Sequence, residues 1–154
     1  MKIFLFLTLM LFVNDSNIVH QDTPLQIDQY GNIKGLPKKY SPAKFDKLKG
    51  KLQIKNNTVL FPNCLKQYFH KLENPKLYLS ASWYHSKEIM PYYINFVIYN
   101  KDSDYSYHIL VDLDSLELIE IYKETKEENS YYHIEIELSQ NCINEYQSNV
   151  ELIN

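Results

Sequence analysis

Two histidines and an aspartate are the side chains in this sequence most suited to catalysis. His108 and Asp112 lie four residues apart, and His133 follows in a later segment. Imidazole and carboxylate groups together can bind a divalent metal or exchange protons with a substrate. The three residues predict, as an alternative function, a small hydrolase or lyase.

Their spacing argues against a shared site. On one strand, a rise of about 3.4 Å per residue would separate His108 from Asp112 by about 13 Å, too far to share a metal ion. Only cross-strand pairing could bring them to His133. We therefore favour a polar role on a solvated strand face, with Asp112 shaping a turn. No nucleophile elbow is present, so we predict no catalytic residue, no metal site and no cofactor.

The two cysteines, Cys64 and Cys142, are predicted to form a disulfide. An even number of cysteines is typical of proteins in oxidising compartments. The bridge would span 142 − 64 = 78 residues. On the chain-entropy model, such a loop stabilises a fold by about 4 kcal/mol. Two free buried thiols are the alternative, because sequence does not give the distance between them.

The first 20 residues have the pattern of a signal peptide. A positive start at Lys2 precedes an apolar run over residues 3–13, and a polar stretch closes it. The run is shorter than the roughly 20 residues that cross a bilayer. We expect cleavage between Ser16 and Gln21, a secreted or periplasmic protein, and no integral membrane span afterwards. A buried N-terminal strand or helix is the alternative.

The remaining composition indicates one folded domain. Hydrophobic residues make up 45% of the chain and charged residues 23%, with a net charge of −3. Every cationic side chain is lysine, so the planar guanidinium that grips phosphates and guanine edges is missing. We expect no nucleic-acid partner.

The chain is predicted to divide into an extended arm over residues 21–50 and a single domain over residues 51–154. The arm holds all three glycines, three prolines and much of the lysine. In the domain, a hairpin over residues 52–61 precedes one amphipathic helix over residues 63–73. Alternating apolar and polar residues then predict four or five strands between residues 76 and 138. These elements indicate an α+β fold, with the helix packed on an antiparallel meander.

The more polar side of this meander is the predicted binding surface. Tyrosine is enriched at protein interfaces, and its rings also suit sugars. We expect an exported binding module for a protein, peptide or glycan partner, which includes an inhibitor or immunity-type role. A structural envelope protein is a second alternative. The surface comprises Tyr78, Ser80, Ser82, Tyr84, Tyr93, Asn95, Tyr99, His108 and His133.

One segment resembles a known family. Over Tyr105–Leu118, an apolar strand ends in Val111-Asp112, turns, and returns as a second apolar strand, which is similar to PepSY-type exported domains. Leu116 stands where that family usually has glycine. The resemblance implies a cystatin-like arrangement, with a helix laid across an antiparallel sheet, and a non-catalytic module that binds or restrains a protein.

Overall fold

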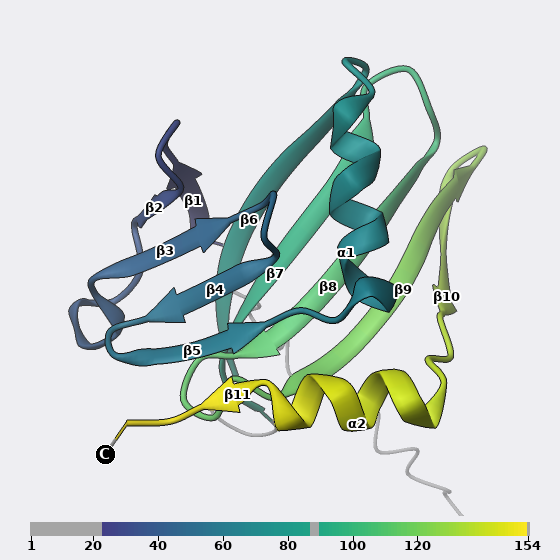
Figure 1. Cartoon of the computed structure of the whole chain (residues 1–154). Coiled ribbons are helices and arrows are strands. Elements are labelled where there is room, and N and C mark those ends of the chain that lie inside the picture. Colours follow the sequence, from purple (N-terminus) through teal and green to yellow (C-terminus); the bar gives the residue numbers. More distant parts are fainter. Residues whose placement is uncertain (1–22, 87–89, 154) are drawn as a thin grey trace, which may run out of the picture.

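The computed structural model describes residues 23–86 and 90–153, so the predicted signal peptide lies outside the described residues. Within them, eleven antiparallel strands form one sheet in the order β10-β9-β8-β7-β6-β1-β2-β3-β4-β5-β11 (Figure 1). Only two short α-helices accompany the described sheet. The prediction of a four- to five-stranded sheet with one packed helix and an extended arm is therefore wrong.

The five longest predicted strands are where the alternation places them. They are β6 (Leu77–Ser86), β7 (Met90–Asn100), β8 (Tyr105–Asp112), β9 (Leu118–Glu127) and β10 (Ser130–Glu135). Consecutive strands pair antiparallel, as a meander requires. The apolar side of the central strands faces the core, because one side of a strand carries every second residue.

The region predicted as an arm is instead part of the sheet. It forms β1 (Thr23–Ile27), β2 (Asn32–Lys34) and β3 (Ala43–Asp46), followed by the predicted hairpin of β4 (Lys51–Ile54) and β5 (Asn57–Leu60). The first strand joins the two halves of the sheet, because β1 pairs with β6 on one side and with β2 on the other.

The glycines of this region serve tight turns. Gly31 has φ +82°, and a Cβ added there would lie 2.3 Å from the carbonyl oxygen of Phe45. Gly50 has φ +65°, also in the left-handed region that favours glycine. The few apolar residues between these turns are then buried, among them Ile33 and Phe45. Short buried strands, rather than a solvated arm, are the result.

The two helices lie on the same side of the long strands (Figure 1). The first, α1 (Asn63–His70), continues into a 3-10 turn at Lys71–Glu73 and agrees with the predicted helix. The second, α2 (Gln140–Ser148), was not predicted. It begins at Ser139, whose hydroxyl accepts a hydrogen bond from the Cys142 N–H at 3.2 Å. The chain then ends in β11 (Val150–Glu151), which pairs with β5.

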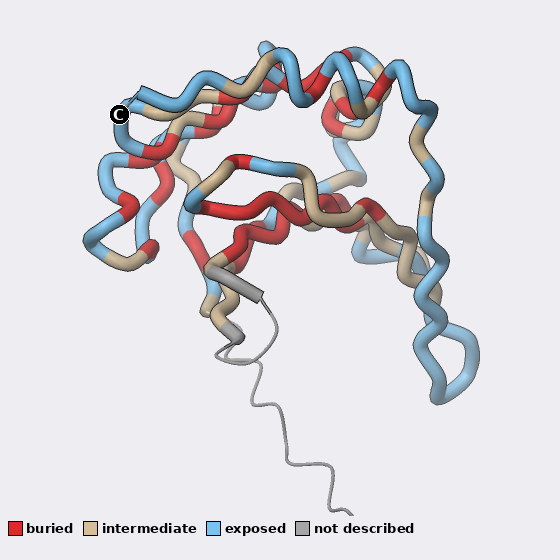
Figure 2. The backbone as a smooth tube through the Cα atoms, turned by 90° about the horizontal axis from the view of Figure 1, so that it is seen from below, coloured by how far each residue is buried: buried red, intermediate tan, exposed pale blue. Residues whose placement is uncertain are grey.

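The core lies between two layers. The long strands form one layer, and β3, β4 and β5 with the two helices form the other, with buried residues concentrated where the layers meet (Figure 2). Five aromatic side chains fill its centre: Phe45, Phe61, Phe69, Phe96 and Tyr146. The ring centroids of Phe45 lie 4.5 Å from Phe96 and 4.9 Å from Phe69. Each ring comes from a different segment, so the cluster fixes how the layers pack.

The predicted disulfide is confirmed. Cys64 at the start of α1 is bonded to Cys142 in α2, with their Cα atoms 6.2 Å apart. The bridge therefore ties together two helices that are 78 residues apart in sequence.

Candidate interaction surface

The residues predicted for binding share one side of the long strands, opposite the core. The register of β6 and β7 places Tyr78 beside Tyr99, Ser82 beside Asn95, and Tyr84 beside Tyr93. On β8, His108 lies beside Val97 of β7. His133 lies on β10 beside Glu124 of β9. Cross-strand pairing thus collects these residues on one face.

The centre of this face is packed rather than open. Asn95 is 4% exposed, Ser82 and Tyr93 are 8% exposed, and His108 is 9% exposed. The rings of Tyr84 and Tyr93 stack with centroids 5.1 Å apart. Only the margin, including Tyr78 and Ser80, is exposed. A broad open tyrosine platform is therefore not what these residues form.

His108 is held by hydrogen bonds on both ring nitrogens. Its Nδ1 lies 3.1 Å from Asn95 Nδ2, and its Nε2 lies 2.8 Å from Ser106 Oγ. The Asn95 amide can only donate through Nδ2, so Nδ1 accepts and Nε2 carries the proton. Burial, with a smaller effect of His133, lowers the pKa of His108 to about 4. The imidazole is therefore neutral at pH 7.

Tyr122 lies between the two histidines. Its ring stacks on His108 with centroids 4.4 Å apart and on His133 at 3.9 Å. Burial raises the pKa of Tyr122 above its ordinary value, and Glu124 adds to the rise. At the outer end, His133 Nε2 lies 2.6 Å from Glu120 Oε1. We call His108, Tyr122 and His133 the ring ladder; it connects three strands, β8, β9 and β10.

The proposed catalytic set does not meet in one pocket. The carboxylate of Asp112 accepts hydrogen bonds from the N–H groups of Asp114 at 2.7 Å and Ser115 at 2.8 Å, so it shapes the β8–β9 turn. His108 and His133 are on opposite sides of the Tyr122 ring. Within the described residues, no group of three or more histidine, cysteine or acidic side chains is placed to hold a metal.

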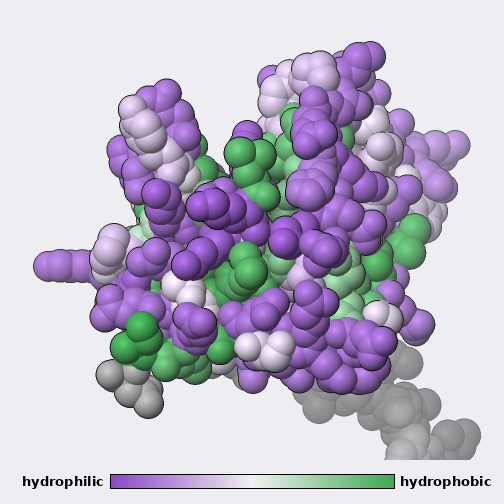
Figure 3. Space-filling view, viewed as in Figure 1, coloured by the Kyte–Doolittle hydropathy of each residue, from purple (hydrophilic) through white to green (hydrophobic). Residues whose placement is uncertain are grey.

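Strand β10 is the most exposed apolar segment of the sheet. All six of its residues are exposed, including Tyr131 at 64%, Tyr132 at 50% and Ile134 at 53%. The strand lies at the end of the sheet, with β9 as its partner on one side. Figure 3 shows hydrophobic residues at the margin of the molecule where β10 lies in Figure 1. Apolar side chains thus reach solvent on both faces of an edge strand.

The backbone of β10 also has an open side. The Ile136 N–H donates to the Ile121 carbonyl oxygen at 2.9 Å, continuing the pairing of β10 with β9. Because backbone groups of an antiparallel strand alternate in direction, those of Tyr131, His133 and Glu135 point away from β9. An incoming strand would find both hydrogen-bonding groups and apolar side chains there.

Sequence reasoning included His133 in the binding surface but not its neighbours Tyr131, Tyr132 and Ile134. Alternation predicted the strand correctly, yet it assigned one of its sides to the core. The signal was present in the doubled Tyr131-Tyr132, which places an aromatic ring on each face whichever side is buried.

No family model matches the chain, and no similar protein was found among the curated proteins or the solved structures. The resemblance of Tyr105–Leu118 to PepSY-type domains therefore stays a prediction. Among the described residues, no helix is long and apolar enough to cross a membrane.

Proposed function

We propose that this chain is a secreted or periplasmic binding module, without catalytic activity, that docks a protein or peptide partner along the outer edge of β10. The disulfide between Cys64 and Cys142 supports a compartment that oxidises thiols. The predicted signal peptide supports export. An inhibitor or immunity-type role falls within this class of function.

The observation that carries the proposal is the exposure of β10. Natural proteins usually protect a sheet edge with lysine, proline, a bulge or a covering segment, because an open edge recruits other strands. The sequence of β10, Ser-Tyr-Tyr-His-Ile-Glu, contains neither lysine nor proline, and its pairing with β9 shows no register shift. A partner that adds a strand would cover the edge and bury its apolar residues.

The ring ladder supports this role by holding the edge in place. His133 stacks on Tyr122 and forms a hydrogen bond with Glu120, so both contacts connect β10 to β9. An edge strand fixed in this way loses less conformational freedom when a partner binds. No observation favours the hydrolase or the envelope protein over this function.

A selection with a random decapeptide library on the folded, disulfide-bonded chain tests the proposal. We expect selected peptides to lose at least about tenfold in affinity for Ile134→Lys, because the change puts a charge into the apolar contact. Tyr30→Lys is the matched control, since Tyr30 is 69% exposed in the β1–β2 turn.

Three outcomes would contradict the proposal. They are the failure of any peptide to be selected, equal losses for Ile134→Lys and Tyr30→Lys, and equal affinity for both variants and the unmodified chain. A glycan array is the second arm: selective glycan binding that survives Ile134→Lys would assign the partner to another class and another surface.

A further inference from the structure

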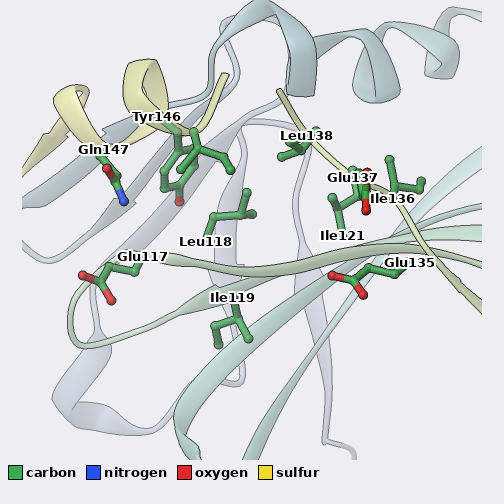
Figure 4. A pocket seen from close by; sticks show the side chains of 11 residues that line it. Glu117, Leu118, Ile119, Ile121, Glu135, Ile136, Glu137, Leu138, Tyr146 and Gln147 are labelled. Carbon is green, nitrogen blue, oxygen red and sulfur yellow. The ribbon is translucent and has the colours of Figure 1, made fainter. Parts of the chain in front are cut away.

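A groove lies between the first half of β9 and α2, next to the end of β10. Its volume is about 420 Å³, which is within the range of ligand-binding cavities. Figure 4 shows α2 on one side of this space, β9 along its floor and the segment after β10 closing one end. Apolar side chains form most of its lining: Leu118, Ile119, Ile121, Leu138, Ile143 and Tyr146.

Acidic side chains stand at both ends of the groove. Glu117 lies at one end, and Glu135 and Glu137 lie at the other (Figure 4). No lysine is among the described residues that line it. The apolar floor therefore has a negative charge at each end, which favours a ligand with the opposite charge at both ends.

The groove also exposes part of the backbone of β9. Pairing between β9 and β10 runs only as far as Tyr122 and Glu135, with one further bond from Ile136 to Ile121. Beyond that point the chain turns away toward α2 (Figure 1). Among the described residues, Leu118 and Ile119 have no backbone partner on this outer side. A second, shorter stretch of sheet edge thus faces the cavity.

We propose that this groove binds an extended peptide segment in which a short apolar stretch is flanked by lysine or arginine at each end. The segment would pair with the free edge of β9, place its apolar residues over the partly exposed Leu118 and Ile143, and set its cations beside the glutamates. Because Ile121 is already bonded to Ile136, the free stretch of β9 is Leu118–Glu120. A segment of about six residues would pair with these three residues and extend past both ends toward the glutamates.

This site meets the edge of β10 only at Glu135, and its test uses other residues. The probe is the capped hexapeptide Lys-Thr-Val-Thr-Val-Lys, titrated by calorimetry against the full disulfide-bonded chain. One control is the same peptide with glutamate at both ends. The other has proline in place of the second of its two threonines. We expect only the first to bind, because the second is repelled and the third lacks a needed N–H.

Substitutions in the chain locate the binding. We expect Glu117→Gln with Glu137→Gln to weaken binding by about tenfold, and about 0.5 M salt to weaken it similarly. Glu73→Gln with Glu127→Gln is the matched control, because it removes the same charge from exposed positions elsewhere. The methyl resonances of Ile119 and Ile143 should shift on titration, whereas that of Ile134 should not.

Several results would overturn this inference. No binding of the lysine peptide would do so, as would equal binding of the glutamate peptide. Equal losses in the two double variants would show attraction to total charge alone. Competition by n-hexylamine at the same concentration as the peptide would show that the groove takes a small apolar amine and not a strand.

Discussion

His108 has a side chain suited to catalysis, but its burial gives it a structural role. It is 9% exposed and hydrogen-bonded on both ring nitrogens, so it has no free nitrogen to offer a substrate. Its neighbour Asn95 has a buried Oδ1 with no hydrogen-bond partner among the described residues. These groups are part of a packed sheet face. The burial of His108 in that face makes the unfolding free energy of the chain depend on pH.

The unfolding free energy should fall as the pH drops from about 6.5 to about 4. Burial lowers the pKa of His108 to about 4 in the folded chain, whereas the unfolded value is about 6.5. The unfolded chain therefore binds an extra proton in this window, and stability is lost toward acid. We expect His108→Gln to remove about 2 kcal/mol of the loss between pH 7 and pH 4.5.

Urea unfolding at the two pH values measures this difference. The matched control is His70→Gln, which makes the same substitution at an exposed histidine. Identical pH dependence of His108→Gln and His70→Gln would show that His108 titrates normally in the folded protein.

Leu116 combines complete burial with a backbone conformation that disfavours its side chain. It is 0% exposed and has φ +57° in the β8–β9 turn. Its carbonyl oxygen accepts a hydrogen bond from the Tyr146 hydroxyl at 2.7 Å. Glycine is the residue that this backbone conformation favours, so packing in the same core cluster as Tyr146 of α2 offers a reason for leucine here.

Substitution of Leu116 should separate these two effects. Leu116→Ala loses the packing and keeps the backbone cost, so we expect it to lower the unfolding free energy by about 3 kcal/mol. Leu116→Gly loses slightly more packing but regains about 1 kcal/mol of backbone energy. Chemical denaturation should therefore find the glycine variant at least as stable as the alanine variant; a glycine variant less stable by about 1 kcal/mol would contradict the argument.

The elements that could be predicted are those whose burial alternates regularly. Strands β6 to β9 and helix α1 have long, one-sided apolar patterns, and the sequence places them correctly. Strands β1, β2 and β3 are three to five residues long, too short for such a pattern to distinguish them from an extended arm. Helix α2 buries only Cys142 and Tyr146 on its inner face. Its position depends on the disulfide and the aromatic core, which are contacts distant in sequence.

Removal of the disulfide tests how far α2 depends on it. We expect Cys64→Ala with Cys142→Ala to lower the unfolding free energy by about 4 kcal/mol, since the bridge closes a long loop. The amides of α2 should lose more hydrogen-exchange protection than those of β7. A double variant with unchanged stability and equal protection in both elements would show that packing alone holds α2.

At the scale of the whole molecule, the described sheet has more strands than the sequence predicts, and its edge strand β10 is exposed. Cross-strand register, which sequence patterns do not specify, decides that Tyr122 joins His108 to His133 and that Asp112 stays apart. The binding face could be predicted as a set of residues, because they alternate on known strands. The burial of Ser82, Asn95 and His108 could not be predicted, because sequence does not give the cross-strand pairing of β6, β7 and β8.

Hydrogen exchange by NMR along β10 tests most directly whether this edge is the docking site. In the free chain, we expect the outward amides of Tyr131 and His133 to exchange rapidly and the inward amides of Tyr132 and Ile134 to be protected. Addition of a selected decapeptide should slow exchange at Tyr131 and His133. Protection of these two amides before the peptide is added, or exchange that the bound peptide leaves unchanged, would contradict the account.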